Sequence, residues 1–478
     1  MHETKKIKAT VLTQYPTPDN NKLDELLKQE IAENQQKIIV LDDDPTGVQT
    51  VHDISVYTGW DPDSIRAGFA EKNRLFFILT NSRGFTAEQT TKVHREIIAN
   101  IAAVSKETGT DYLVMSRSDS TLRGHYPLET RLLKEGMEQA GGCRVDGEII
   151  CPFFKEGGRF TIDNVHYVKY GEELVPAGET EFAKDKTFGY RSSDLRDYVE
   201  EKSGGEFKAD SVTCIALESL RAQDFDGITA QLMGVSGFNK IIVNAIDSCD
   251  VKAFCIALYR AIKQGKHFLF RTAAALVKEI GGVTDRPLLT HDELIHPGNK
   301  NGGIIVVGSH TQKTTKQLEA LLTLPGLKEI PFDSDLVLQG DETLKAEVDR
   351  TAAQMDEAIQ AGQSAVVYTK RTLLTVENDT KEKALVRSVK ISDAVQSLVG
   401  KLKETPGFIV AKGGITSSDI GTKALGVKCA NVLGQIRPGI PVWQTDAGSK
   451  FPRIPYVIFP GNVGEIDTLK EAVQILLK

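Results

Sequence analysis

The sequence predicts an α/β protein of two domains, each with a mostly parallel sheet flanked by helices. At 478 residues the chain is longer than a single hydrophobic core usually organises. Short apolar runs rich in β-branched residues recur along it, and each ends in a polar or Gly-rich turn that a helical pattern often follows. This alternation is typical of βαβ units and disfavours a sandwich or a helical bundle.

The N-terminal segment, residues 1–36, is predicted to be a helical extension. Its stretch "NKLDELLKQEIAENQQK" places apolar side chains with the spacing of one helix face, at Leu23, Leu26, Leu27 and Ile31. We expect this helix to pack on the first domain or on a partner subunit.

The first domain is predicted over residues 37–280. Its expected strands lie in "KIIVLDDD", "LFFILTNSRG", "YLVMSRSDS", "EIICPFF", "VTCIALES" and "KIIVNAIDS". Residues 281–302 then lose this pattern and are rich in Gly, Pro and polar residues, which is typical of an interdomain linker.

The second domain is predicted over residues 303–478. Its expected strands lie in "GIIVVGSHT", "SAVVYTKR", "GFIVAKGG" and "PYVIFPGN". The helices expected in "TTKQLEALLTL" and near "SSDIGTKALG" each follow a strand through a Gly/Ser/Thr turn. Their N-termini should therefore face the carboxyl edge of the sheet, where open α/β sheets bind ligands.

Composition narrows the class of partner. A formal charge of −7 and a pI near 5.8 argue against nucleic acid and anionic membranes, although an acidic small molecule is compatible where cations gather locally. No apolar run reaches the roughly 18–20 residues of a membrane helix, and the N-terminus lacks a signal-peptide core, so we expect a cytoplasmic protein. The six cysteines form no CxxC pair and indicate neither a zinc knuckle nor a disulfide framework.

Three consecutive acids, Asp42, Asp43 and Asp44, end the first expected strand in "DDDPTG". Carboxylates this close repel one another unless solvent, a cation or hydrogen-bond donors intervene. They can orient the hydroxyls of a polyol, act as a general base or help to hold Mg²⁺, whereas a solvated, capped turn is the structural alternative. The cost of mutual repulsion favours a site.

Two further stretches bring cations and hydroxyls to strand ends. "SRSDSTLRGH" offers Asp119 and Arg123, and "FKEGGRF" offers Arg159; Arg83 lies in "NSRGF". Arginine suits a substrate carboxylate because it donates two parallel hydrogen bonds, while a salt-bridged loop is the structural alternative. His166, further along, is of a kind more often structural than catalytic.

Three glycine-containing turns follow strands of the second domain: "GSHT", "KGGITSS" and "PGNVGE". Glycine lets a backbone approach a polyphosphate, and a helix N-terminus supplies oriented N–H donors. An ordinary turn is the alternative for each of them. The chain contains neither a P-loop nor a strand-linked GxGxxG, so neither nucleotide fingerprint applies.

Together, "DDDPTG", "SRSDSTLRGH", "GGRFT", "VVGSHTQKTTKQ", "KGGITSSD" and "PGNVGE" resemble, in this order, the four-carbon acid sugar kinase family, from about Lys37 onward. The family pattern ADD-x-TG falls on residues 42–47, with its acid pair on Asp43 and Asp44. Asp42 stands where the family often has Ala, and we interpret it as a solvated turn residue. The pattern K-x-DSTLRG falls on residues 117–124, with Arg117 in place of the leading Lys.

The nucleotide side fits more loosely. The family's SGS falls on residues 307–309, its GGDT on 413–416 and its K-SGNFG on 459–464, so that Ile415 replaces an Asp and Phe459 stands near the place of a Lys. The nucleotide-binding residues that the resemblance implies are Ser309, Gly413, Gly414, Ile415, Thr416, Gly461 and Asn462.

The resemblance implies an acid sugar kinase, a phosphotransferase with an alcohol acceptor, that uses ATP and Mg²⁺. Members phosphorylate threonate, erythronate or 3-oxo-tetronate, with the active site in the cleft between a sugar-acid domain and a nucleotide domain. Asp43, Asp44 and Asp119 are then the catalytic candidates. The substrate-binding candidates are Arg83, Ser120, Arg123, Gly158 and Arg159. The metal ligands are not indicated.

Two other classes stay open. A sugar-acid-binding or regulatory protein would keep the acid pocket and lack turnover because of the altered nucleotide motifs. An NAD-dependent dehydrogenase is disfavoured by the missing fingerprint. The expected partner is a small acid rather than a nucleic acid or a membrane, and a homodimer is compatible with the sequence.

Overall fold

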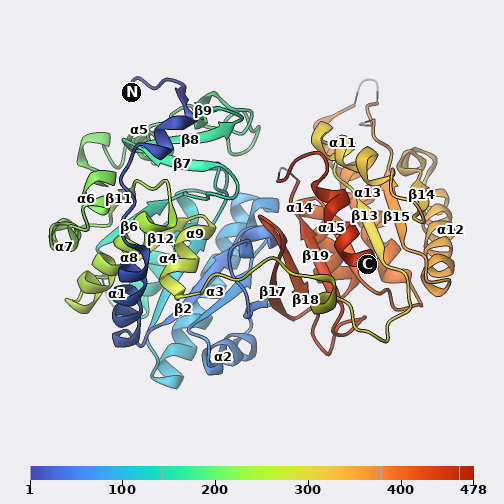
Figure 1. The fold of residues 1–478 in the computed structure, drawn as a ribbon, viewed down its shortest axis with the longest axis horizontal. Coiled ribbons are helices and arrows are strands. Elements are labelled where there is room, and N and C mark those ends of the chain that lie inside the picture. The colour runs from blue at the N-terminus through green and yellow to red at the C-terminus, as the bar shows by residue number, and fades with distance from the viewer. Residues whose placement is uncertain (1, 142–143, 373, 377–378, 462) are drawn as a thin grey trace. The chain divides into compact units, whose positions relative to one another are not determined.

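The computed structural model describes residues 2–141, 144–372, 374–376, 379–461 and 463–478 (Figure 1). The chain divides into two compact units. The first unit consists of Met1–Gly47 and Gly59–Asp285, and the second of Val48–Thr58 and Arg286–Lys478.

The first unit is built on a parallel sheet with the strand order β10–β11–β6–β12–β5–β2–β4. Every residue of β2, β4, β6 and β12 is buried, as expected of a parallel sheet covered on both faces. The strands are β2 (Lys37–Asp42), β4 (Leu75–Leu79), β5 (Tyr112–Arg117), β6 (Gly147–Cys151), β10 (Thr213–Ile215), β11 (Asn239–Val243) and β12 (Phe268–Thr272). The helices are α1 (Asn20–Glu33), α2 (Pro62–Ala70), α3 (Ala87–Thr108), α4 (Leu128–Gln139), α5 (Leu195–Lys202), α6 (Leu217–Arg221), α7 (Phe225–Gly234), α8 (Ser248–Lys263) and α9 (Ala274–Gly281).

Helix α1 packs on α8 of the first unit. Asp19 caps its N-terminus by accepting hydrogen bonds from two backbone N–H groups, and the helix buries Leu23 and Leu27. An ion pair from Arg260 of α8 to Glu30, with 2.8 Å between nitrogen and oxygen, adds a polar contact beside this apolar seam. The apolar spacing read from the sequence therefore corresponds to a real packing face.

A small antiparallel sheet accompanies the main sheet of the first unit and was not predicted. Its order is β1 (Ile7–Lys8), β9 (Glu173–Pro176), β8 (Val165–Tyr170) and β7 (Arg159–Ile162). Because β7 begins at Arg159, this sheet fixes the backbone of one predicted substrate-binding residue.

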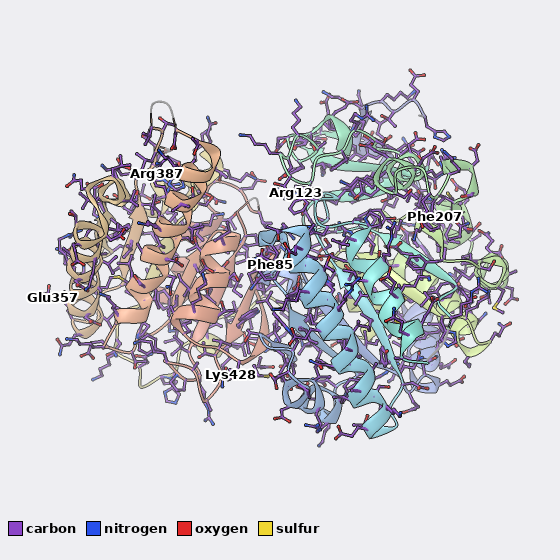
Figure 2. All side chains as sticks on the ribbon, turned by 180° about the vertical axis from the view of Figure 1, so that it is seen from behind. Phe85, Arg123, Phe207, Glu357, Arg387 and Lys428 are labelled. Atoms are coloured by element: carbon purple, nitrogen blue, oxygen red, sulfur yellow. The ribbon has the colours of Figure 1, made fainter. Side chains whose placement is uncertain are left out.

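A buried ion pair lies near the amino ends of β6 and β11. Lys240 Nζ is 2.6 Å from a carboxylate oxygen of Glu148, and both side chains are fully buried. The ammonium group also lies 4.1 Å and 3.5 Å from the ring centroids of Phe207, labelled in Figure 2, and Phe238. This ion pair and the two aromatic rings lie at the edge of the sheet away from the carboxyl ends of the strands.

The second unit has a mixed, mostly parallel sheet with the order β3–β17–β18–β19–β16–β13–β15–β14. The pairings from β19 to β14 are parallel, and those among β3, β17, β18 and β19 are antiparallel. The strands are β3 (Ile54–Tyr57), β13 (Ile304–Val307), β14 (Lys328–Phe332), β15 (Ala365–Thr369), β16 (Ile409–Lys412), β17 (Cys429–Arg437), β18 (Ile440–Gln444) and β19 (Pro455–Phe459). The helices are α10 (His291–Leu294), α11 (Gln312–Leu321), α12 (Asp341–Gln360), α13 (Lys381–Lys401), α14 (Gly414–Asp419) and α15 (Thr468–Leu477).

The segment predicted as a linker contributes to the core of the second unit. Leu289 and Leu294 are buried there with side chains of β13, β16, β19 and α15. By contrast, the polar face of α12 is exposed, and Glu357 points outward from it in Figure 2. The predicted fold class, α/β with mostly parallel sheets flanked by helices, is confirmed. No helix in the described ranges is both long and apolar enough to cross a bilayer.

Candidate active site

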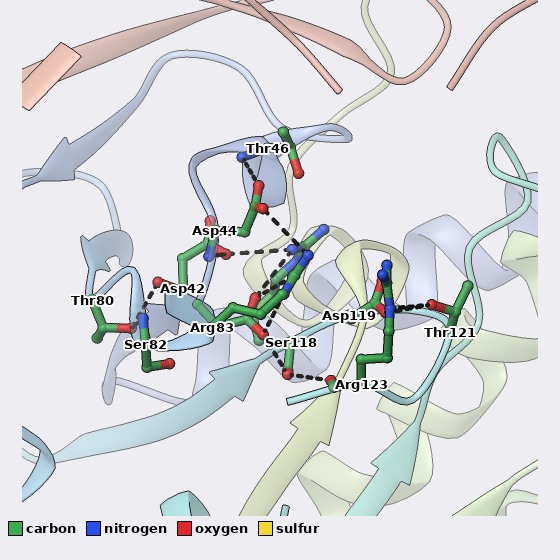
Figure 3. Close-up of polar contacts among 12 residues, drawn as sticks. Asp42, Asp44, Thr46, Thr80, Ser82, Arg83, Ser118, Asp119, Thr121 and Arg123 are labelled. Carbon is green, nitrogen blue, oxygen red and sulfur yellow. Dashed lines mark hydrogen bonds and ion pairs between the residues drawn. The ribbon is translucent and has the colours of Figure 1, made fainter. Parts of the chain in front are cut away.

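Polar side chains meet at the carboxyl edge of the first unit's sheet. Strands β2, β4 and β5 are neighbours and run parallel, so the loops that follow them, at residues 43–47, 80–84 and 118–124, lie side by side (Figure 3). At this edge Arg83 forms ion pairs with Asp43 and Asp44, and Arg123 forms one with Asp119. The charge of Asp119 also acts on Arg83, so the five predicted residues form two neighbouring groups.

The interpretation of Asp42 as a solvated turn residue is wrong. Asp42 is the last residue of β2 and is fully buried, and its Oδ1 lies 3.4 Å from Nη1 of the buried Arg117. Within the described part of the chain its Oδ2 has no hydrogen-bond partner. Burial is therefore the largest influence on this carboxyl: it raises the pKa of Asp42 to about 8, with Arg117 opposing and the neighbouring acids adding to the shift.

This buried carboxyl predicts a pH-dependent stability. The folded protein holds the Asp42 proton more tightly than the unfolded chain, whose pKa is about 3.9. The free energy of unfolding should therefore fall as pH rises from about 4 to about 8, and Asp42→Asn should remove a part of that fall on the order of 2 kcal/mol. Urea unfolding of both proteins at pH 5 and pH 8 measures it. Equal pH dependence in the two proteins would contradict the assignment.

Arg83 connects two of the predicted catalytic acids. Its Nη2 lies 2.6 Å from Asp43 Oδ1, its Nε lies 3.2 Å from Asp43 Oδ2, and its Nη1 lies 3.3 Å from Asp44 Oδ2. Burial acts to raise the pKa of Asp44, but Arg83 and hydrogen bonds from Thr46 outweigh it and leave the pKa below its usual value. Asp44 is thus ionised at neutral pH, and the charge of Arg83 is already met by carboxylates.

Asp119 forms a second pair with Arg123. Arg123 Nε lies 2.6 Å from Asp119 Oδ2, and the Thr121 hydroxyl donates to the same oxygen. Burial opposes ionisation, but Arg123 and then Arg83 overcome it and hold the pKa of Asp119 well below its usual range. Ser120 follows in the same loop, and its carbonyl oxygen lies 2.8 Å from Nε2 of His166.

His166 contacts the backbone of this loop from a buried position. It is fully buried, and its second ring nitrogen lies 3.0 Å from the Thr161 hydroxyl. Burial lowers the pKa of His166 to about 4, so the ring is neutral at physiological pH. Its Nε2 donates to the Ser120 carbonyl when the proton sits on that nitrogen, which fixes the backbone beside Asp119.

Arg159 differs from the other two candidate arginines. It is buried, and no carboxylate of the described residues lies within ion-pair distance of it. Its Nη1 donates to the carbonyl of Gly157, its Nε has no hydrogen-bond partner in the described structure, and burial lowers its pKa. Gly158, at φ +73°, makes the turn that precedes β7. Of the three candidate arginines, Arg159 is therefore the one whose charge no carboxylate of the described residues neutralises.

One aromatic ring holds two guanidinium groups together. The centroid of the Phe182 ring lies 5.1 Å from Cζ of Arg123 and 5.6 Å from Cζ of Arg159. The ring is 7% exposed and comes from a loop that no sequence motif marked. Phe182 thus joins the Asp119–Arg123 pair to Arg159.

We expect Phe182→Leu to weaken binding of an acidic ligand. Cation–π contacts contribute about 0.5–2 kcal/mol, so the loss corresponds to about a 2- to 30-fold rise in Kd or KM, with kcat less affected. Phe182→Tyr keeps the ring and should restore most of the affinity. Calorimetry on both variants measures this, and equal affinity in Phe182→Leu and the unmodified protein would exclude the role.

The predicted nucleotide residues meet at the carboxyl edge of the second unit's sheet. Ser309 follows β13, and Gly413, Gly414 and Thr416 follow β16, the neighbouring strand. A Cβ on Gly413, which has φ +120°, would lie 3.2 Å from Cβ of Ser309, and one on Gly308 would lie 2.2 Å from the Thr416 hydroxyl, so both turns depend on glycine.

The remaining candidates for nucleotide binding are Ile415, Gly461 and Asn462. Ile415 is 70% exposed at the start of α14, and Gly461 follows β19, the neighbour of β16 on the other side. Asn462 lies outside the described residues. These assignments stay predictions.

The donor set at this second edge does not fit a protein-held Mg²⁺. Among the described residues, no carboxylate forms a hydrogen bond or ion pair with the side chains of Ser309, Thr416 or Lys412. In the first unit, Asp43, Asp44 and Asp119 are already paired with arginines. Mg²⁺ prefers carboxylate and water oxygens, and the described contacts of these side chains offer it no unpaired carboxylate.

Several residues at the carboxyl edges of the two sheets were not predicted as site residues from the sequence. Lys412 lies within the quoted "KGGITSS" and Arg371 directly after "VVYTK", so the rule that ligands bind at carboxyl ends of strands would have found both. Arg271 lies on β12, a strand that was not predicted, and donates from Nη2 to the Arg123 carbonyl at 2.9 Å. No motif or spacing in the sequence indicated a role for Phe182.

Two family models match the chain. One, a sugar-binding N-terminal domain, matches residues 38–280, and the other, a nucleotide-binding C-terminal domain, matches residues 304–469. The fold of the two units and the loops at their sheet edges therefore belong to a protein with a sugar-binding domain and a nucleotide-binding domain. The chain is a member of the four-carbon acid sugar kinase family, which combines these two domains.

Solved structures share the fold. A crystal structure from Salmonella typhimurium LT2 is 16% identical with a TM-score of 0.64, and the match covers 91% of this chain and 98% of that one. A Haemophilus influenzae protein from a family of unknown function is 17% identical with a TM-score of 0.57, covering 92% of this chain and all of that one. Among curated proteins, none matches the sequence.

Proposed function

We propose that this protein is an ATP-dependent kinase that phosphorylates a hydroxyl of a small sugar acid of about four carbons. The observation that carries the proposal is Arg159, a buried guanidinium without a carboxylate partner in the described structure, beside the ionised Asp119. A buried, unpaired cation is costly, and an acidic ligand would relieve that cost. Asp119, whose charge acts on Arg159, and Asp43 and Asp44 at the same sheet edge are the proposed acceptors for hydroxyl protons.

In this proposal the first unit binds and orients the acid. Arg159 donates to the substrate carboxylate, with Ser120 and Gly158 lining the site. Arg83 and Arg123 are neutralised by acids, so they hold Asp43, Asp44 and Asp119 in place instead of binding the carboxylate themselves. This revises the expectation that all three arginines bind substrate.

Asp44 is the proposed proton acceptor. Its side chain is 15% exposed, against 2% for Asp43 and 11% for Asp119, so it is the most accessible of the three carboxylates. Phosphoryl transfer is dominated by in-line positioning and charge neutralisation, and a carboxylate with a low pKa can take the hydroxyl proton late in the transfer. Ser309, Gly413, Gly414, Ile415, Thr416 and Gly461 are proposed to bind ATP, and any Mg²⁺ would arrive on its phosphate oxygens.

A coupled assay of ADP release over a panel of tetronates, aldonates and related hydroxy acids tests the proposal. If the protein is a kinase, we expect ADP release with at least one tetronate-sized acid, and we expect Asp44→Asn to lose this activity. Binding of an acid by calorimetry without turnover of any panel member would instead identify a sugar-acid-binding protein. Absence of both binding and turnover would reject the acid pocket.

A further inference from the structure

The carboxyl edge of the second unit's sheet carries three basic side chains to which the sequence analysis gave no role. Arg371 follows β15, Lys313 lies in the first turn of α11 after β13, and Lys412 ends β16. These strands are neighbours in the order β16–β13–β15, so the three side chains belong to one sheet edge. Within the described residues, no carboxylate lies within ion-pair distance of any of them, whereas the adjacent Lys370 is paired with Asp333 and Asp335.

Lys412 is held by carbonyl oxygens. Its fully buried Nζ donates to the carbonyls of Pro460 and Gly461 at 2.6 Å and 3.2 Å and lies 4.4 Å from the centroid of the Phe459 ring. Burial, and then the nearby Lys313, lower the pKa of Lys412 to about 7. Phe459 is its cross-strand partner in the β16–β19 pairing and stands near the position where the family pattern has Lys. The amino group of a lysine from the neighbouring strand therefore lies beside the position near which the family pattern has Lys.

Arg371 points its guanidinium at the backbone of the same edge. Its Nη2 donates to the Ser309 carbonyl, and its Nε lies 3.3 Å from the Thr315 hydroxyl. Its Nη1 is buried without a hydrogen-bond partner in the described structure, and burial lowers the pKa of the group with only Tyr368 opposing. A guanidinium with one donor free and no counter-ion is suited to a phosphate, which accepts two parallel hydrogen bonds.

Lys313 completes the edge. Its Nζ donates to the Gly464 carbonyl at 3.2 Å, and the side chain is exposed, so it can turn to a ligand at little cost. Ile415 and Phe459 leave the motifs without charge, and the carboxylates that the structure describes after β14, Asp333 and Asp335, are already paired with Lys370. We therefore assign the neutralisation of a polyphosphate to Arg371, Lys313 and Lys412.

We propose that Arg371, Lys313 and Lys412 bind the di- or triphosphate of a nucleotide at this edge. The proposal rests on the proposed function for the presence of a nucleotide, and it adds which residues of this chain meet the phosphate charge.

Fluorescence titration with mant-ADP and mant-AMP in EDTA tests the proposal, because protein groups alone then meet the phosphate charge. The unmodified protein should bind mant-ADP about 10-fold more tightly than mant-AMP or better, and Arg371→Gln should lower this preference to within about 3-fold. Arg371→Lys keeps a point charge and should give an intermediate preference. Arg453→Gln, which removes a positive charge before the amino end of β19, is the matched control and should keep the full preference.

Each outcome is decisive. An unchanged preference in Arg371→Gln overturns the inference and leaves the proposed kinase intact. A protein that binds neither nucleotide but still binds a sugar acid overturns the inference together with the kinase. If circular dichroism shows that Arg371→Gln does not fold, Lys313→Gln, at an exposed position, takes its place. Lys313→Gln should lower the preference for mant-ADP over mant-AMP by about 3-fold. An unchanged preference in that variant would likewise overturn the inference.

Discussion

Replacing Arg159 by Gln is expected to raise the KM for the sugar acid by about 100-fold, because the ligand carboxylate loses a charge-assisted pair of hydrogen bonds. The reason lies in the pairing of the neighbouring arginines. Arg83 and Arg123 each face a carboxylate at 2.6 Å, so neither can replace the lost charge without leaving its own partner unpaired. The kcat at saturating acid should fall much less. Steady-state kinetics on the best acid of the panel, with calorimetric Kd values, measure both.

The conservative change and a distant arginine serve as controls. Arg159→Lys keeps the charge but not the planar pair of donors, so its KM should lie between those of Arg159→Gln and the unmodified protein. Arg191→Gln removes a guanidinium that is 81% exposed in the same unit and should leave KM unchanged. A KM for Arg159→Gln within about 3-fold of the unmodified value would mean that another group binds the carboxylate.

The parallel core of each unit could be predicted because each of its strands has a recognisable pattern in the local sequence. Runs such as "KIIVLDDD" and "GFIVAKGG" combine a fully buried strand with a turn and a following helix, and they correspond to β2 and β16. The pairing of β3 could not be predicted, because its partner strand is distant in the sequence. β3 at residues 54–57 pairs with β17 at 429–437, and only tertiary structure selects that pairing.

The candidate site was predictable where sequence spacing places residues at the ends of neighbouring strands. Asp43, Asp44, Arg83 and Asp119 meet because β2, β4 and β5 are adjacent and parallel. The charge state of each residue was not predictable, because it depends on burial and on partners from other loops. Asp42 and Asp44 are two residues apart, yet burial outweighs Arg117 and raises the pKa of the first, whereas Arg83 lowers that of the second.

Asp44→Asn is expected to lower kcat by about 10²- to 10⁴-fold, the range typical of a lost general base, with little change in KM. The amide keeps the shape of the side chain and can still accept the hydrogen bond that Thr46 N–H gives Asp44 Oδ1 at 2.9 Å. It cannot take up the hydroxyl proton. Because the pKa of Asp44 is below its usual value, the unmodified enzyme should also keep its kcat as pH falls from 8 to 6. Coupled ADP release at saturating acid and ATP measures both effects.

An exposed aspartate shows whether the loss belongs to Asp44 or to any lost negative charge. Asp63→Asn changes a carboxylate that is 92% exposed on α2 of the same unit, and its kcat should match that of the unmodified protein. A second comparison separates an effect on the reaction from an effect on folding. Asp43 accepts hydrogen bonds from both Arg83 and Ser118, so Asp43→Asn should lower the free energy of unfolding as well as kcat. Asp44→Asn should lower kcat with a smaller loss of stability. If Asp44→Asn retained more than about a tenth of kcat, Asp44 would be a positioning residue and the proton acceptor would have to be sought at Asp119.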